Sequence, residues 1–130
     1  MDLDLAGRTA LVTAASGGIG RGVAEALAAA GVHVAISGRT RASLEEVAET
    51  LAASAGGRPK IVVGDVGAAG GPAEIAAGAA AALGGRIDIL VNNAGGARPI
   101  AGEVDESYWE ESFTLNFLAA RRLASASFPR

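Results

Sequence analysis

The segment Thr13–Gly20, which reads TAASGGIG, places two hydroxyl groups and three glycines directly after the apolar run TALV. Free backbone amides and the positive end of a following helix would favour an anion such as a phosphate. Gly18 and Gly20 would let a ligand approach the backbone closely, and Ser16 offers a hydroxyl. Small residues also let a helix pack closely on a strand, so this turn alone leaves both interpretations open. Neither the G-x-G-x-x-G pattern nor the G-x-x-x-x-G-K-[ST] pattern is present, since Val23 stands where the third glycine of the first would fall.

A second candidate group, SGRT, ends with Arg39 and Thr40 after another apolar run. An acidic side chain at this place binds a ribose diol, whereas a guanidinium suits a 2′-phosphate. Arg39 lies roughly 20 residues beyond the glycine-rich turn, which is the usual spacing for such a residue. The sequence therefore favours a phosphate ligand here, with an ordinary exposed arginine as the alternative. Thr40 is a further binding candidate and can also cap a helix.

Polar residues follow two more apolar runs. Asp65 in VVGDV could accept a hydrogen bond from an adenine amino group, although a carboxylate that caps the next turn is the simpler interpretation. The NNAG segment at Asn92–Gly95 could tie neighbouring strand ends together, and its small residues leave room for a flat ligand. The single histidine, His33, suggests no metal site, and the absence of cysteine excludes disulfide and zinc-thiolate chemistry.

The elements that must position these groups alternate along the chain. We expect strands at Thr9–Thr13, Val32–Ser37, Lys60–Gly64 and Ile87–Val91. We expect helices at Ile19–Gly31, Thr40–Leu51, Pro72–Leu83 and 106–126, the last capped by Asp105. The expected buried face of the first helix consists of Ile19, Val23, Ala26, Leu27 and Ala30, and that of the second consists of Leu44, Val47, Ala48 and Leu51. This alternation predicts an α/β fold, a doubly wound parallel sheet of the Rossmann type with about four strands, whose ligands bind beyond the carboxyl ends of the strands.

Composition narrows the class of protein. The chain has 130 residues, 50% apolar and only 4% aromatic, so we expect one domain with an aliphatic core. A net charge of −3 offers no basic surface for nucleic acid or an anionic membrane. The first residues lack the pattern of a signal peptide and no apolar run is long enough for a membrane span, which predicts a cytoplasmic protein.

Four motifs in order resemble the short-chain dehydrogenase/reductase family over most of the chain, up to about Leu123. They are LAGRTALVTAASGGIG with the helix that follows, GDV, IDILVNNAG and WEESFTLN. Members of this family transfer hydride between NAD(H) or NADP(H) and a small alcohol or carbonyl compound.

The resemblance also implies roles for individual residues. It places Thr13, Ser16, Gly18, Ile19 and Gly20 around the cofactor pyrophosphate, Asp65 and Val66 at the adenine, and Asn92, Ala94 and Gly95 beside the ribose and nicotinamide. It makes Arg39, with Thr40, a determinant of preference for NADP(H) over NAD(H), and Asn116 the family's catalytic asparagine.

Two departures from the family pattern matter. Ala14 stands where the family usually has glycine, which is costly if the backbone there needs a positive φ. The family's catalytic Ser and Tyr-x-x-x-Lys are absent, because the only tyrosine is Tyr108 and the only lysine is Lys60. We therefore expect residues 1–130 to form a single, shortened NAD(P)-binding domain that binds cofactor and is catalytically impaired alone.

Two alternatives remain at this point. The chain could be a non-catalytic NADP(H)-binding sensor module, or a methyltransferase-like domain, against which Arg39 and the NNAG segment count. In either case the fourth strand would form a bare sheet edge. The last helix would present an apolar stripe of Phe113, Phe117, Ala120 and Leu123, which predicts self-association through that helix.

Overall fold

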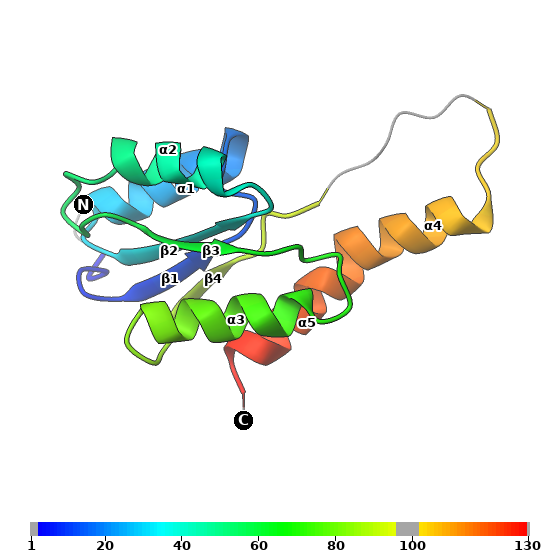
Figure 1. Ribbon diagram of the computed structural model, residues 1–130. Coiled ribbons are helices and arrows are strands. Elements are labelled where there is room, and N and C mark those ends of the chain that lie inside the picture. The colour runs from blue at the N-terminus through cyan, green and yellow to red at the C-terminus, as the bar shows by residue number, and fades with distance from the viewer. Residues whose placement is uncertain (1–2, 96–101, 130) are drawn as a thin grey trace.

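The computed structural model describes residues 3–95 and 102–129. Its parallel sheet contains strands β1 (Thr9–Val12), β2 (His33–Gly38), β3 (Lys60–Val63) and β4 (Ile89–Val91) in the order β3-β2-β1-β4 (Figure 1). The chain starts in the middle of the sheet, builds outward to β3 and then returns to the other side of β1. This is the predicted doubly wound α/β architecture, and it creates a crevice where the winding direction reverses, between β1 and β4.

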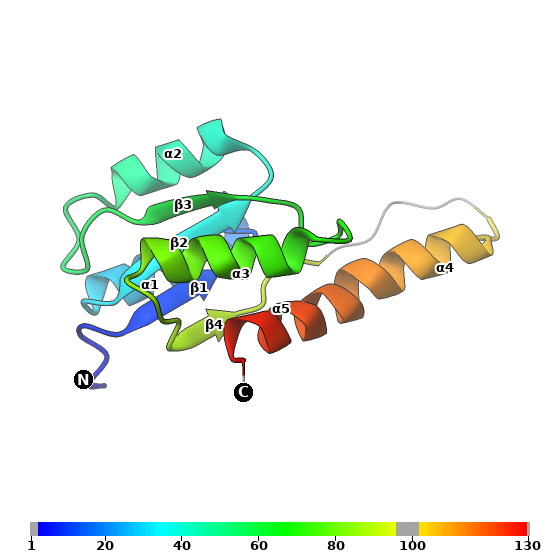
Figure 2. The ribbon, with the colours of Figure 1, turned by 60° about the horizontal axis from the view of Figure 1, so that its bottom comes forward.

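Helices cover both faces of the sheet. Helices α1 (Gly18–Ala29) and α2 (Arg41–Thr50) lie on one face, while α3 (Gly71–Ala82) and α5 (Ala119–Ser127) lie on the other (Figures 1 and 2). Residues that alternate along β1 serve the two layers, since Ala10 and Val12 face α1 and α2, whereas Leu11 faces α3 and α5. The predicted aliphatic core is therefore two thin cores, one on each side of β1 and β2.

The predicted buried face of α2 is confirmed, but that of α1 is partly wrong. The α1 residues that are buried are Gly20, Ala24 and Ala28, with Val23 and Leu27 packed beside them. Ile19 is 78% exposed, and Ala26 and Ala30 also face outward. Because α1 is rich in alanine and glycine, hydrophobicity does not distinguish its faces. The close approach of the helix to the sheet instead selects its smallest side chains for the contact line.

The last helical segment is divided by a turn of π-helix. Helix α4 (Glu106–Phe113) begins at Asp105, whose carboxylate accepts a hydrogen bond from Tyr108 N at 3.1 Å, as the predicted cap requires. A π-helical turn (Thr114–Leu118) then leads into α5. Both flanking helices continue without a break in the ribbon, and α4 extends away from the sheet (Figures 1 and 2).

The prediction of one continuous apolar stripe on this last segment is only partly right. The π turn has more residues per turn than an α-helix, so the residues before and after it face different directions. Leu123 is 1% exposed and packs in the core with Ile75 and Ala79 of α3, so it already has cover. Phe113 and Phe117 remain exposed.

The edges of the sheet follow the prediction. Within residues 3–95 and 102–129, β4 pairs with β1 on one side and with no strand on the other. Residues 96–101, in the middle of the loop expected after β4, lie outside the described residues.

Over the same described ranges, no helix combines the length and apolar character that crossing a bilayer would require.

Candidate functional site

A hydroxyl at the end of β1 organises the crevice between β1 and β4. Thr13 Oγ1 donates to Val91 O at 3.3 Å and accepts from the backbone N–H groups of Asn93 at 3.0 Å and Ala94 at 3.1 Å. The side chain of Asn93 donates in turn to Ala14 O at 3.3 Å. These bonds fix the turn after β1 against the NNAG segment. Asn93 was not among the selected site residues, but the tandem asparagine was expected to tie neighbouring strand ends together, and it does so here through Asn93.

The glycine-rich turn contains two backbone conformations that favour glycine. Gly18 has φ +57°, and Ala14 has φ +50° although it carries a side chain. The positive φ that made Ala14 a costly departure is therefore present. Substituents on Gly17 or Gly18 would meet no atom within 4 Å, so the amino end of α1 is open. Gly20 differs, because a Cβ there would overlap Ala14 O and lie 2.6 Å from Asn93 Nδ2.

A cleft of about 230 Å³ opens at the carboxyl ends of the strands, beside this turn. Four separate segments line it: Ala14 and Ser16; Ser37, Gly38 and Arg39; Gly64, Asp65 and Val66; and Ala94 and Gly95. Leu115, from the π turn, closes one side. The fold thus brings six of the predicted site residues into one cleft, namely Ser16, Arg39, Asp65, Val66, Ala94 and Gly95.

The remaining predicted residues support or flank this cleft. Thr13 is buried in the hydrogen-bond network described above, and Gly20 lies in the contact between α1 and the sheet. Gly18 and Ile19 are exposed at the start of α1. The Asn92 side chain points to α5, where Nδ2 donates to Ala120 O at 3.3 Å. Thr40 occupies the N-cap position of α2 without a side-chain capping bond.

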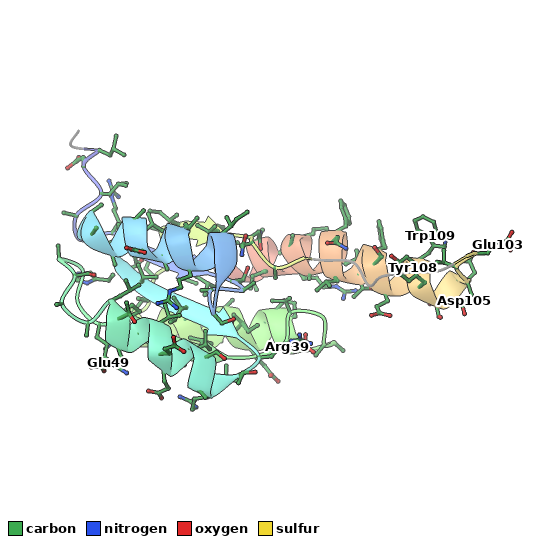
Figure 3. The ribbon with its side chains drawn as sticks, turned by 90° about the horizontal axis from the view of Figure 1, so that it is seen from above. Arg39, Glu49, Glu103, Asp105, Tyr108 and Trp109 are labelled. Carbon is green, nitrogen blue, oxygen red and sulfur yellow. The ribbon has the colours of Figure 1, made fainter. Side chains whose placement is uncertain are left out.

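The charged groups of the cleft differ in how they are held. Asp65 Oδ1 accepts from Gly67 N at 2.9 Å, so its carboxylate caps the turn after β3 while also lining the cleft. Arg39 is exposed at the end of β2, and in the described part of the chain it has no ion pair. Figure 3 shows this arginine on the body of the protein, well removed from the far end of α4. An unpaired guanidinium beside an open helix amino terminus suits a phosphate-bearing ligand.

Asn116 lies next to the NNAG segment, in the π turn. Its Nδ2 donates to Ser112 O at 3.0 Å and to Ser112 Oγ at 3.3 Å. A Cβ added to Gly95 would lie only 2.8 Å from Asn116 Oδ1, so glycine at that position allows the two segments to approach. The fold therefore brings Asn116 to the edge of the cleft, through Gly95 and the neighbouring Leu115.

The tyrosine and the lysine lie elsewhere. Tyr108 belongs to α4, and Figure 3 shows it with Trp109 near the outer end of that helix, away from Arg39. Lys60 is the first residue of β3, at the amino ends of the strands, whereas the cleft lies at their carboxyl ends. The chain thus contains no acid–base pair of side chains at the cleft from these two residue types. Among the described residues, no three His, Asp or Glu side chains form a group suited to a metal ion.

Sequence reasoning missed four residues that line the cleft. Ser37, Gly38 and Gly64 line the cleft at or just beyond strand ends, and Leu115 lines it from the π turn. The first three sit inside segments already quoted for their polar neighbours, so the signal was present there. Leu115 is a single apolar residue within a helical pattern, and nothing in the sequence separates it from core leucines.

A doubly wound sheet with an open glycine-rich turn and a cleft at its switch point defines a nucleotide-binding class of fold. Comparison with known families and structures is more specific. The model of the short chain dehydrogenase family matches residues 8–130. A fatty acyl-CoA reductase of Acinetobacter baylyi is 34% identical over 128 residues, which cover 95% of this chain and 42% of that protein.

Solved structures that resemble this chain include NADP(H)-bound reductases. L-sorbose reductase from Gluconobacter frateurii, in complex with NADPH and L-sorbose, superposes with a TM-score of 0.91 at 33% sequence identity. The matched region covers 99% of this chain and 49% of the reductase chain. Pseudomonas aeruginosa RhlG, in a complex with NADP, has a TM-score of 0.86 at 34% identity, with coverage of 96% and 48%. This chain belongs to the short-chain dehydrogenase family, and it spans about half the length of these relatives.

Proposed function

We propose that the chain binds NADP(H) across the cleft and serves an oxidoreductase reaction on a small alcohol or carbonyl compound. The observation that carries this proposal is the cleft itself, in which motif residues from four separate segments meet. When bound, the cofactor would supply or accept hydride. Two relatives described above are complexes with NADPH or NADP, which supports the choice of cofactor.

Each part of the cleft has a task in this proposal. The free amides between Ser16 and Gly20, at the positive end of the α1 dipole, bind the pyrophosphate. Asp65 and Val66 hold the adenine, with Thr13 fixing the turn. Asn92, Ala94 and Gly95 form the side that receives the ribose and nicotinamide. Asn116 is the catalytic candidate at this end of the cleft.

We propose that Arg39 sets the preference for NADP(H), with Thr40 beside it. A guanidinium forms paired, charge-assisted hydrogen bonds to a phosphate and finds no equivalent partner on an unmodified ribose. Titration of intrinsic NADPH and NADH fluorescence tests this. We expect NADPH to bind at least tenfold more tightly, and Arg39→Ser to remove most of that difference.

Arg121→Ser, which changes an exposed arginine of α5 outside the cleft, is the matched control and should retain the preference. Equal affinities for NADPH and NADH in the unmodified chain would contradict the role of Arg39. Failure of both nucleotides to bind would contradict the proposed function as a whole.

We propose that residues 1–130 act as one NAD(P)-binding domain that binds cofactor without appreciable turnover on its own. Tyr108 and Lys60 both lie away from the cleft, and general acid–base catalysis is commonly worth about 10²–10⁴-fold. A non-catalytic NADP(H)-binding module is the second candidate, and it rests on the same observation. Assay of the isolated chain with NADPH and a panel of small carbonyl compounds should show binding without oxidation of NADPH. Turnover at rates typical of enzymes would contradict both the proposed lack of turnover and the non-catalytic module.

We propose finally that the chain self-associates through an aromatic face on its last helical segment, formed by Trp109, Phe113 and Phe117. These side chains are 61%, 55% and 53% exposed, and the two phenylalanine rings stack with centroids 5.0 Å apart. Acidic residues dominate α4, whereas Arg121 and Arg122 lie in α5. An antiparallel pair of these helices would place opposite charges against each other around a shared aromatic centre.

A further inference from the structure

A second cavity lies at the amino ends of the strands, away from the cleft described above. Its volume is about 440 Å³, and it opens to solvent. Its walls come from the start of β2, the loop at residues 56–58, the start of β3 and the end of α3. This volume is within the range of sites that bind small molecules. The function proposed above assigns no role to the side chains of this cavity.

The cavity contains the only histidine and the only lysine of the chain, His33 and Lys60. The parallel register of β2 and β3 pairs Lys60 with Ala35, which lies two residues after His33 on β2. Side chains two residues apart on a strand share a face, so His33 and Lys60 leave the same face of the sheet. This is the face that α3 covers, since Ala35 packs with residues of that helix. The fold therefore brings together two basic side chains that are distant in the sequence.

The imidazole of His33 is held in a defined orientation. Its Nδ1 lies 3.1 Å from Gly56 O, and because a carbonyl oxygen can only accept, Nδ1 donates this hydrogen bond. Gly56 is itself fixed, since its N–H donates to Ala28 O at 2.9 Å and a Cβ there would overlap Val32 O. Among the described residues, Nε2 of His33 has no hydrogen-bond partner. This nitrogen becomes a charged donor when it takes up a proton.

The positive charge of the cavity comes from Lys60, and from His33 in its protonated form. Arg58 also lines the cavity, but its Nη1 donates to Glu49 Oε2 at 2.6 Å and its Nη2 donates to Glu45 Oε2 at 3.3 Å. These carboxylates neutralise much of the charge of the guanidinium. Lys60 is exposed, and over the described ranges it has no ion pair. A free ammonium beside a free imidazole nitrogen suits an anion with several acceptor oxygens.

We propose that this cavity binds a small phosphomonoester, with Lys60 and His33 holding its phosphate. Both side chains would donate charge-assisted hydrogen bonds to the phosphate oxygens. An inorganic phosphate would fill only part of the cavity, and the apolar side chains of Ala82 and Leu83 offer a wall for the carbon portion of an ester. A cation near the carboxyl end of α3 would also stabilise that helix, and this is the alternative role that a test must separate.

The test is a titration of the His33 imidazole followed by nuclear magnetic resonance, since a chain with one histidine gives one set of ring signals. Phenyl phosphate and inorganic phosphate are the two probes, and sodium chloride at equal ionic strength controls for screening. Lys60→Gln removes the proposed contact. Arg121→Gln is the matched control, because it removes one positive charge from an exposed position of α5. Arg39→Ser reports whether the anion enters the other cleft, and far-ultraviolet circular dichroism establishes that the variants are folded.

We expect a saturable shift of the His33 signals with both probes. Phenyl phosphate should bind about threefold or more tightly than inorganic phosphate, because its ring contacts the apolar wall. Lys60→Gln should weaken the binding of both probes at least about fivefold, because a charge-assisted hydrogen bond is lost. Arg121→Gln and Arg39→Ser should bind both probes as the unmodified chain does.

Three results would overturn the inference. Equal affinities for the two probes would contradict the assignment to an ester. Equal binding by Lys60→Gln and the unmodified chain, or a shift that sodium chloride reproduces, would leave Lys60 with the helix-stabilising role alone. Binding that is lost in Arg39→Ser and kept in Lys60→Gln would place the anion in the other cleft. None of these results contradicts the binding of NADP(H), so the inference and the proposed function fail separately.

Discussion

Ala14 holds a left-handed backbone conformation, φ +50°, that its side chain opposes. The position is fixed from both sides, since Ala14 O accepts a hydrogen bond from Asn93 and the residue lines the cleft. A left-handed conformation costs an alanine about 1–2 kcal/mol. Glycine at this position would remove the strain and so stabilise the fold. It would also increase the conformational entropy of the unfolded chain, which destabilises the fold.

Ala14→Gly should therefore leave the free energy of unfolding unchanged or raise it by up to about 1 kcal/mol, as measured by urea denaturation. Ala26→Gly is the control, because Ala26 is an exposed residue inside α1, where glycine should cost about 0.5–1 kcal/mol. Equal losses in both variants would show that Ala14 is unstrained.

Gly20, unlike Ala14, is a residue of this turn that cannot be replaced without a clash. A Cβ there would overlap Ala14 O and crowd Asn93 Nδ2, and both atoms belong to the network that joins β1 to the NNAG segment. Gly20→Ala should lower the free energy of unfolding by about 1–3 kcal/mol. Gly22 lies in the same helix, and a Cβ there meets nothing within 4 Å.

Gly22→Ala is thus a control with an effect of the opposite sign, a gain of about 0.5–1 kcal/mol from higher helix propensity. Chemical denaturation of the two variants in parallel decides the point. Equal stability of Gly20→Ala and Gly22→Ala would contradict the close approach of α1 to the turn at Gly20.

At the scale of elements, Asp88 joins the start of β1 to the start of β4. Its Oδ2 accepts from Thr9 N at 3.0 Å and from Thr9 Oγ1 at 3.2 Å, and its Oδ1 lies 2.7 Å from Arg86 Nε. The donated N–H of Thr9, followed by Arg86, holds the pKa of the Asp88 carboxyl below its usual value. Sequence reasoning did not select this residue, because Asp88 fell inside the expected strand Ile87–Val91, whereas β4 begins only at Ile89.

A lowered carboxyl pKa stabilises the fold at pH values above the pKa of the unfolded chain, about 3.9 for an aspartate. That stability is lost as pH falls through the lower pKa of the folded state. Asp88→Asn should therefore be less stable than the unmodified chain at pH 7, and the difference should shrink below about pH 4. Urea midpoints between pH 7 and pH 3 measure this, with Glu25→Gln, an exposed carboxylate of α1, as the control. A difference that is independent of pH would contradict the account.

Element positions were largely predictable because the strands are short apolar runs bounded by glycines and polar residues. The buried faces were predictable only where side chains differ in size and polarity. In α2, charged residues separate Leu44 from Val47, so the periodicity marks the core. In α1, alanine occurs on every side, and the tight approach at Gly20 decides which side is buried. The π turn was not predictable, because residues 114–118 are ordinary helix residues.

The candidate site divides in the same way. Residues with distinctive chemistry, such as Arg39 and Asp65, were found from the sequence, and the fold brings them together. Leu115 was not found, since its importance comes only from the three-dimensional position of the π turn.

At the scale of the whole molecule, the described chain leaves the outer edges of β3 and β4 without a partner strand and exposes the aromatic face of Trp109, Phe113 and Phe117. Phe113→Asp should weaken self-association, because it places a charge in the centre of the proposed apolar contact. Sedimentation velocity at several protein concentrations should show a shift toward the monomer of at least tenfold in dissociation constant. Ser125→Asp, on an exposed part of α5, is the control and should associate normally. A concentration-independent monomer in the unmodified chain would exclude the proposed contact.

The most direct test of the whole account is the location of bound NADP⁺ on the chain. Backbone amide resonances followed by nuclear magnetic resonance during a titration report it residue by residue. We expect the largest shifts at Ser16–Gly20, Arg39, Asp65 and Gly95, all at the carboxyl ends of the strands. No saturable shift at those residues, or larger shifts at the amino ends of the strands, around His33 and Lys60, would contradict the proposed binding site.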